Sequence, residues 1–201
     1  MDPFLPQEQS DHTESKVFHA LEKLGELIRS LQWETAKAQQ LSPLQLQVLL
    51  FLHGHGPQQR TVAYLADEFS VTRPTISDAI KSLMHKGYVV KEKNPADSRS
   101  TYLHLTVTGS KLIGQLNGYP HKLLEEIGAL PTKKREALLS TLLHLLHSTQ
   151  RSGLARASRM CFHCAHYDGD HKGKHYCQLF QKPLPEAALR IDCPEFSAPE
   201  H

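Results

Sequence analysis

The chain has 201 residues, and 23 Lys and Arg against 21 Asp and Glu give it a formal net charge of +2. This length suffices for one hydrophobic core plus a small appended unit, and the near-neutral charge means that any basic surface must be local. The N-terminus lacks a basic stretch leading into an apolar one, and the apolar runs are too short to span a bilayer. We therefore expect a cytoplasmic protein without a membrane segment.

The first 52 residues predict a polar segment and two helices. Residues 1–15 are polar and contain proline, so we expect them to be disordered. From Lys16 to Ala36, apolar residues recur with a helical period and form one stripe, which predicts a long helix able to contact a second subunit. Ser42-Pro43-Leu44-Gln45 is a capping box, and the almost wholly apolar residues that follow predict a central buried helix.

Two short helices are predicted next, close together in the chain. The first covers residues 62–69 after the N-cap Thr61. The second begins at Thr72-Arg73-Pro74-Thr75 and ends at Gly87, because glycine is the residue that most easily ends a helix in the left-handed conformation. Only a tight turn separates the two helices, which is typical of a helix-turn-helix.

A β-hairpin is predicted directly after these helices. Residues 89–91 and 102–105 have strand-like patterns, and the polar, proline-containing residues 92–101 predict the loop between them. Two short helices followed by a hairpin form a winged helix-turn-helix, in which the second helix enters the major groove of DNA and the hairpin reaches the flanking backbone or minor groove.

The predicted helix-turn-helix and wing are locally basic. Residues 72–99 carry six Lys or Arg against three Asp or Glu, although the whole chain is almost neutral. Cations are therefore concentrated where phosphates would lie. The outward face of the second helix is predicted to offer short hydrogen-bonding and cationic groups to base edges and phosphates. These groups are Arg73, Thr75, Ser77, Asp78, Lys81 and Ser82.

Two further helices complete the predicted main domain. The first covers about 108–127 and is loosened by Gly114, Gly118 and Pro120, and the second is the leucine-rich stretch 133–150. The chain is thus predicted to comprise a disordered segment, a main domain and a C-terminal extension. Their boundaries are residues 1–15, 16–152 and 153–201.

Four stretches within residues 16–150 resemble the MarR family of bacterial transcriptional regulators. They are LSPLQLQVLLFL, TVAYLADEFSVTRPTISDAIKSLMHKGYV, the wing segment ADSRSTYLHLT and the TVTG that follows it. The resemblance implies a mainly α-helical winged helix-turn-helix fold with long dimerisation helices. It also implies an obligate homodimer formed by the first and the last two helices, which would bind a pseudo-palindromic operator in double-stranded DNA.

The resemblance also assigns roles to individual residues. Arg99 at the wing tip would enter the minor groove, with Asp97 bracing it. Arg73, Thr75, Ser77 and Lys81 would face the major groove. Family members are often released from DNA by small molecules, so an effector is a further candidate partner, although the sequence names no ligand. Aromatic residues that could line an effector cavity are expected to be core instead: Trp33, His53, His55 and Tyr64.

All four cysteines lie in the last 41 residues, at Cys161, Cys164, Cys177 and Cys193. In a reducing compartment, clustered cysteines favour metal or redox chemistry over structural disulfides. Four thiolates complete a tetrahedral site, so the spacing C-x2-C-x12-C-x15-C predicts a Zn²⁺ ion bound structurally, which would supply folding energy to a tail poor in large apolar residues.

Three alternatives remain open for the cysteines. Cys193 precedes a proline, as in one iron–sulfur ligand pattern, so a [4Fe–4S] cluster is the alternative cofactor. A disulfide between Cys161 and Cys164 could form a thiol switch, but it would leave the other two cysteines unexplained. A histidine could replace one cysteine as ligand, and the candidates are His163, His166, His171 and His175.

No catalytic motif is present, so the sequence predicts a regulator and not an enzyme. It lacks a G-x-S-x-G elbow, a phosphate-binding glycine loop and an H-E-x-x-H helix. The competing class is an iron–sulfur redox protein or metalloenzyme whose winged helix serves protein contacts. Whether the cysteine site is structural or senses metal or redox state does not follow from its spacing.

Overall fold

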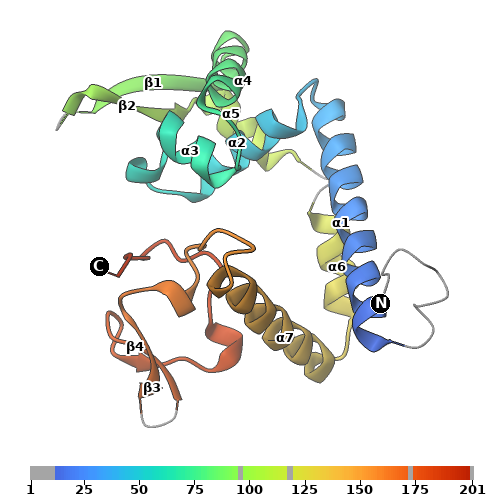
Figure 1. The fold of residues 1–201 in the computed structure, drawn as a ribbon. Helices are drawn as coiled ribbons and strands as arrows, with labels where there is room; N and C mark the ends of the chain where they lie inside the picture. Colours follow the sequence, from blue (N-terminus) through green and yellow to red (C-terminus); the bar gives the residue numbers. More distant parts are fainter. Residues whose placement is uncertain (1–11, 95–96, 117–119, 172–173, 200–201) are drawn as a thin grey trace. The chain divides into compact units, whose positions relative to one another are not determined.

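The computed structural model describes residues 12–94, 97–116, 120–171 and 174–199 (Figure 1). Contacts divide the chain into two units, Met1–Leu124 and Glu125–His201, which are described separately below. The predicted fold class is confirmed, because the first unit is a mainly helical winged helix-turn-helix. A small sheet in the C-terminal tail was not predicted. Across the described residues, no helix combines the length and hydrophobicity needed to cross a membrane.

The first two helices begin near their predicted positions. Helix α1 (Thr13–Ala38) starts before Lys16, so the prediction of disorder is wrong for residues 13–15, while residues 1–11 lie outside the described residues. Helix α2 (Pro43–Gly54) has the predicted capping box. The Gln45 amide donates to Ser42 Oγ at 3.2 Å, and the Ser42 amide donates to Gln45 Oε1 at 3.1 Å. These bonds satisfy two amides that the helix itself leaves unpaired.

The helix-turn-helix is confirmed as helices α3 (Val62–Glu68) and α4 (Arg73–His85), with the 3₁₀-helix η1 (Pro57–Gln59) before them. Each α-helix follows an N-cap threonine whose side chain accepts a hydrogen bond from a backbone amide. Thr61 accepts from the Tyr64 amide, and Thr72 accepts from the Thr75 amide. Gly87 follows α4 with φ +73°, the left-handed conformation that favours glycine.

The wing is longer than predicted. Strands β1 (Val89–Asn94) and β2 (Asp97–Leu105) pair antiparallel. Lys93 lies opposite Thr101 and Glu92 opposite Tyr102, so most of the predicted loop is strand. The loop prediction was wrong because a two-stranded ribbon beyond the core is exposed on both faces. Its residues therefore lack the apolar alternation by which a half-buried strand is recognised.

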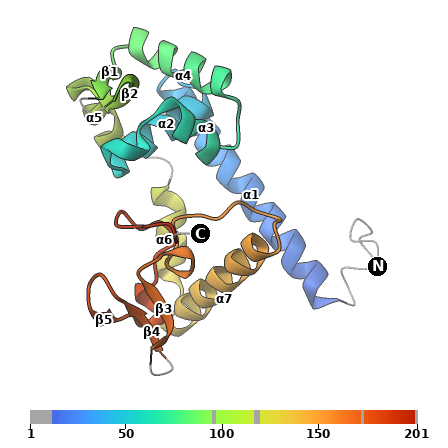
Figure 2. The ribbon, with the colours of Figure 1, turned by 60° about the vertical axis from the view of Figure 1, so that its left-hand side comes forward.

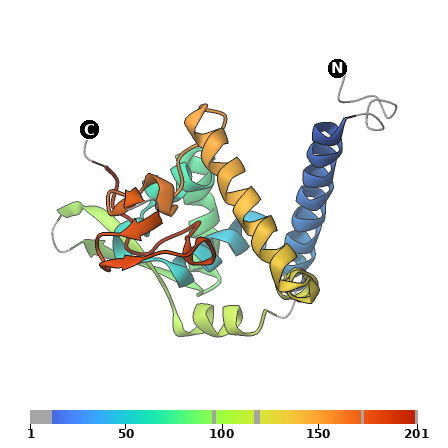
Figure 3. The same ribbon diagram turned by 90° about the horizontal axis from the view of Figure 1, so that it is seen from below.

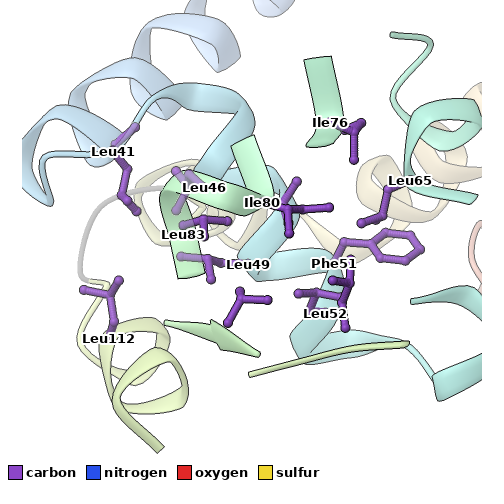
Figure 4. Close-up of a cluster of buried hydrophobic side chains, with 14 of the residues drawn as sticks. Leu41, Leu46, Leu49, Phe51, Leu52, Leu65, Ile76, Ile80, Leu83 and Leu112 are labelled. Atoms are coloured by element: carbon purple, nitrogen blue, oxygen red, sulfur yellow. The ribbon is translucent and has the colours of Figure 1, made fainter. Parts of the chain in front are cut away.

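The core of the first unit is built around α2 (Figure 4). Leu46, Leu49 and Leu52 of α2 are almost fully buried. Leu65 of α3, together with Ile76, Ile80 and Leu83 of α4, points toward them. The core thus fixes the inner face of α4, which leaves its polar outer face for contacts outside the unit.

The predicted helix over 108–127 is wrong, because two helices occupy this region. Helix α5 (Val107–Gly114) ends at Gly114, the first of the three residues predicted to loosen the helix. Helix α6 (His121–Ala129) begins directly after Pro120, and residues 117–119 lie outside the described residues. The TVTG stretch opens α5. Thr106 Oγ1 accepts the Gly109 amide at 3.0 Å and donates to the Gly87 carbonyl at 2.6 Å. A Cβ on Gly109 would overlap the carbonyl oxygen of Tyr88.

The second unit contains a long helix and a tail rich in short elements (Figures 1 and 2). Helix α7 (Thr132–Arg151) confirms the predicted leucine-rich helix, and Gly153 with φ +76° follows it. The tail contains η2 (Cys161–His163), η3 (Glu186–Ala188) and a three-stranded antiparallel sheet of β3 (Tyr167–His171), β4 (Lys174–Cys177) and β5 (Lys182–Pro183). That sheet lies at the C-terminal, red end of the chain in Figure 3.

Candidate nucleic-acid interface and cysteine cluster

Helix α4 presents the predicted polar face to solvent. Arg73, Thr75 and Lys81 are exposed, and Ser77 is half-buried. The opposite face is anchored in the core, because Ile76, Ile80 and Leu83 are fully buried. Burial of one face therefore determines which side chains of α4 can reach a base pair or a phosphate. The α4 residues of the predicted interface lie together on one helix, with their polar groups accessible.

Two side-chain contacts lie on the exposed face of α4, a hydroxyl pair at its start and an ion pair further along. Thr72 Oγ1 lies 2.8 Å from Thr75 Oγ1 and also accepts the Thr75 amide, so the helix start is held by one hydroxyl network. The N-terminal amides of a helix favour an anion such as phosphate. Lys81 Nζ lies 3.1 Å from Asp78 Oδ1. Because both of these side chains are largely exposed, the pair contributes little to stability and leaves Lys81 accessible to an external phosphate.

The wing is anchored to the body by a residue that sequence reasoning missed. The carbonyl of Arg60, which follows η1, accepts the Leu103 amide of β2 at 2.8 Å, and Arg60 Nε donates to the His55 carbonyl at 2.7 Å. Partial burial lowers the pKa of the Arg60 guanidinium. No local sequence signal distinguishes this arginine from an exposed one, because both of its contacts depend on the tertiary fold.

Two predicted residues of the wing tip cannot be placed by their side chains. Asp97 and Arg99 belong to the backbone of β2, but their side chains lie outside the described residues. Their roles in the minor groove therefore stay predictions. Lys91 and Lys93 of β1 are exposed and add positive charge to the same ribbon. Lys86 has a different role, because its ammonium group donates to the Gln40 carbonyl just after α1.

The aromatic residues considered for an effector cavity divide into two groups. His55 stacks on Phe51 with ring centroids 3.7 Å apart, and Tyr64 lies 6.0 Å from the same ring. Both are half-buried against the buried Phe51, so they pack at the edge of the core. The core expectation is wrong for Trp33, which is 59% exposed, and for His53, which is also exposed. Helical spacing alone could not reveal that the α1 stripe is only partly covered.

The four cysteines line one small cavity in the second unit, although they come from separate segments. Cys161 is the first residue of η2 and Cys164 directly follows this helix, where the Cys164 amide donates to the Cys161 carbonyl at 3.0 Å. Cys177 is the last residue of β4. Cys193 is buried, and its amide donates to the Arg159 carbonyl at 2.9 Å. The fold therefore brings residues 32 positions apart in the chain to one place.

Two arginines that sequence reasoning missed hold this arrangement. The Arg190 amide donates to Cys161 Sγ at 3.2 Å, and an Arg190 guanidinium nitrogen lies 4.0 Å from Cys193 Sγ. Arg159 is buried and forms two hydrogen bonds to the Asp192 carboxylate, at 2.7 and 3.0 Å. This paired geometry ties the segment before Cys161 to the segment that carries Cys193.

The cavity among the thiols has a volume of about 20 Å³, enough for roughly one water-sized sphere. Burial raises the pKa of Cys161, the Arg190 amide opposes that rise, and negative charge on Cys193, Cys164 and Cys177 adds to it. Four bare thiolates would therefore repel one another here. In the described parts of the chain, no three Cys, His, Asp or Glu side chains are already arranged to hold a metal ion. The predicted metal site stays a prediction.

The histidines considered as replacement ligands occupy different places. His166 lines the cavity. His163 Nε2 is 2.6 Å from Gln150 Oε1, and His175 Nδ1 contacts the Tyr167 hydroxyl, so both rings have other partners. The His171 side chain lies outside the described residues. Of the three described rings, His166 alone lines the cavity.

The arrangement of α3, α4 and the wing around α2 defines a winged helix-turn-helix protein. Residues 39–100, which contain these elements except the end of the wing, match the MarR family. Through that segment, which is less than half of the chain, the protein is similar to the MarR family.

Two relatives extend the similarity along the chain. The transcriptional repressor NicR of Pseudomonas putida is 27% identical over 139 residues, which cover 69% of this chain and 87% of NicR. The uncharacterized regulator YkoM of Bacillus subtilis is 28% identical over 85 residues, which cover 42% of this chain. The chain matches only 53% of the length of YkoM.

Solved structures with the same fold include two proteins that bind DNA. The S. aureus MepR–DNA complex is 20% identical, with a TM-score of 0.54 over 69% of this chain and 99% of MepR. Bordetella bronchiseptica BpsR, whose DNA binding is regulated by 6-hydroxynicotinic acid, is 20% identical, with a TM-score of 0.53 over 67% of this chain and 95% of BpsR. At these identities the likeness establishes the fold alone.

Proposed function

We propose that this protein is a cytoplasmic, homodimeric regulator that binds a pseudo-palindromic operator in double-stranded DNA. The observation that carries the proposal is the outer face of α4, where Arg73, Thr75 and Lys81 are exposed on a helix fixed by its buried face. Arginine and lysine side chains hydrogen-bond to guanine edges and to phosphates. The hydroxyl of threonine can also hydrogen-bond to a base edge or donate to a phosphate oxygen. Ser77 and the wing residues Asp97 and Arg99 complete the proposed interface.

Exposed apolar residues support the homodimer. The N-terminal part of α1 leaves Phe18 44% and Leu24 48% exposed, in a stripe that continues through Leu27. Leu138, Leu145 and Leu146 of α7 are exposed as well. Exposed apolar surface of this kind on each of the two helices is costly in water and commonly marks a protein interface. A second copy of the chain would cover it and place two recognition helices about one turn of DNA apart.

The DNA-binding proposal is tested by measuring operator affinity at several salt concentrations with fluorescence anisotropy. Arg73→Ala should weaken specific binding by about 1–3 kcal/mol and leave the dimer intact. Lys174→Ala is the matched control, because it removes an exposed positive charge from the tail. Affinity for the wild-type protein should fall steeply as salt rises, since phosphate contacts release counterions. Affinity independent of salt, or unchanged in Arg73→Ala, would refute this interface.

The wing assignment needs its own variant. Arg99→Ala should lower the affinity for the operator more than for an unrelated duplex, because an arginine in the minor groove reads groove width and sequence. The dimer should remain folded, as measured by sedimentation and circular dichroism. Equal operator affinity for Arg99→Ala and wild type in a gel-shift assay would remove the wing from the interface.

A small-molecule effector is a further part of the proposed function. BpsR, which has the same fold, is regulated in its DNA binding by a small aromatic acid. By analogy, we expect a small molecule to alter the operator affinity of this chain, although its residues do not identify that molecule. Screening small aromatic acids for release of the operator would test this expectation.

We also propose that Cys161, Cys164, Cys177 and Cys193 bind a metal, with Zn²⁺ favoured. The four thiols line one small cavity, and four thiolates complete the closed tetrahedral shell that structural zinc takes. A divalent cation would also relieve the repulsion among deprotonated thiols. Elemental analysis of anaerobically purified protein should find about one zinc per chain. Iron, sulfide and a brown colour would instead support the cluster.

A further inference from the structure

Helix α7 carries two separate apolar faces. Leu139 and Leu143 pack with the tail, and Leu143 is almost fully buried there. Leu138 and Leu145, seven positions apart, lie on the opposite side of the helix and are exposed. One face of α7 is thus covered by the protein's own tail. The other is available to the second copy proposed above.

The tail contacts α7 through both apolar and polar groups. Phe162 places its ring 5.6 Å from the His144 ring and 4.9 Å from the His147 ring, measured between centroids. Glu186 of η3 accepts a hydrogen bond from Ser140 Oγ and lies 3.4 Å from His144 Nε2. Figures 1 and 2 show the tail beside α7. The contact therefore runs along more than one turn of the helix.

The residues that make this contact are adjacent in the chain to the cysteine cavity. Met160 and Phe162 flank Cys161, and Leu189 precedes Arg190, whose amide donates to Cys161 Sγ. Among the described residues, only Leu143, Met160 and Leu189 are buried in this cluster, and a few partly buried residues pack against them. A core of this size is too small to hold a segment of about fifty residues by apolar burial alone. The position of the tail on α7 must depend on the links among the cysteine segments.

We propose that metal binding at the four cysteines controls dimerisation, and through it operator affinity, by holding the tail against α7. This inference rests on the metal site proposed above. With the metal bound, the tail packs on Leu139 and Leu143 and fixes the helix whose other face meets the second copy. Without it the tail detaches, and α7 loses the packing on which an amphipathic helix of this length depends. The tail then acts as a metal-responsive clamp on α7, and the affinity between the two copies reports whether the clamp is closed.

The test uses the full-length protein loaded with zinc, depleted by a chelator and reloaded. Depletion should expose the tail to limited proteolysis and weaken the dimer by roughly tenfold, the usual range for coupling between sites. Reloading should restore both properties. Cys164→Ser should behave as the depleted protein. Ala165→Ser, which places the same side chain at an exposed neighbouring position, should behave as wild type.

A second variant separates docking from metal binding. Phe162→Ala should retain its zinc but lose protection of the tail and weaken the dimer, because the ring that contacts His144 and His147 is gone. Dimer affinity unchanged by chelation, Cys164→Ser and Phe162→Ala would overturn the clamp. Failure of the DNA-binding proposal would look different. In that case the dimer would still respond to zinc, but no duplex would bind with salt-dependent affinity.

Discussion

The two units of this protein are stabilised in different ways. Among the described residues of the first unit, sixteen buried apolar residues form one core around α2, whereas the corresponding cluster among those of the second contains three. The tail compensates with directional links, such as the ion pair of the buried Arg159 with Asp192 and the hydrogen bond from the Arg190 amide to Cys161 Sγ. A large core tolerates sequence change at any one position better than a small set of specific links does. The next four predictions test this contrast, from the largest expected effect to the smallest.

Leu49→Ala should destabilise the first unit by about 3 kcal/mol. Leu49 is fully buried at the centre of the α2 core, so its removal leaves a cavity that the neighbouring helices cannot close. The measurement is urea unfolding followed by circular dichroism, with zinc and with chelator. Leu154→Ala is the control, because Leu154 is 83% exposed. A loss of stability that appeared only with chelator would contradict an independent core.

Met160→Ala should destabilise the tail by about 2 kcal/mol and leave the first unit unchanged. Met160 is fully buried, but its cluster belongs to the second unit. Hydrogen exchange measured segment by segment should show faster exchange in residues 153–199 and unchanged exchange in α2. Faster exchange in both units would mean that they unfold as one, which would remove the contrast.

Gly109→Ala should cost about 2 kcal/mol, within the range expected when a group is forced into a packed site. Its new Cβ would overlap the Tyr88 carbonyl oxygen, so α5 would have to move away from the start of the wing. Gly114→Ala in the same helix is the control, since a Cβ there would meet no described atom within 4 Å apart from its chain neighbours and the backbone of its own helix. Thermal unfolding should separate the two variants. Equal melting temperatures would show that this contact can relax without cost.

Thr72→Ala should lower stability by about 1 kcal/mol, the usual contribution of an N-cap side chain. The first unit caps α2, α3, α4 and α5 with side chains, whereas neither η2 nor η3 of the tail has a side-chain cap. Thr72→Ser should retain the hydrogen bond to the Thr75 amide and therefore the stability. If serine and alanine were equally destabilising, the methyl group of Thr72 and not its hydroxyl would be responsible.

Local signals in the sequence predicted most of the first unit. The capping box at Ser42, the caps at Thr61 and Thr72 and the glycine after α4 all act within a few residues, so they could be recognised without a fold. The wing length was underestimated because an exposed ribbon has no apolar alternation. The helix after Thr106 was overestimated because helical periodicity resumes in α6 after a break.

The candidate site was predictable in part. Arg73, Thr75 and Lys81 were identified from their spacing on one helix face, and the structure places all three in solvent. The anchoring roles of Arg60 and Lys86 were not predictable, because their partners lie in distant segments. In the tail, the four cysteines suggested one site from composition and spacing, but Arg159 and Arg190 gave no such signal.

The sequence by itself determined which segments become helices, where most of them begin and end, and which face of α4 is polar, since these properties depend on neighbours a few positions away. Only the tertiary structure decided that the cysteine segments meet around one cavity beside α7, and that α7 has one covered and one open apolar face. Such arrangements depend on contacts between residues far apart in the chain. Packing, charge and backbone links must all be satisfied together before they form.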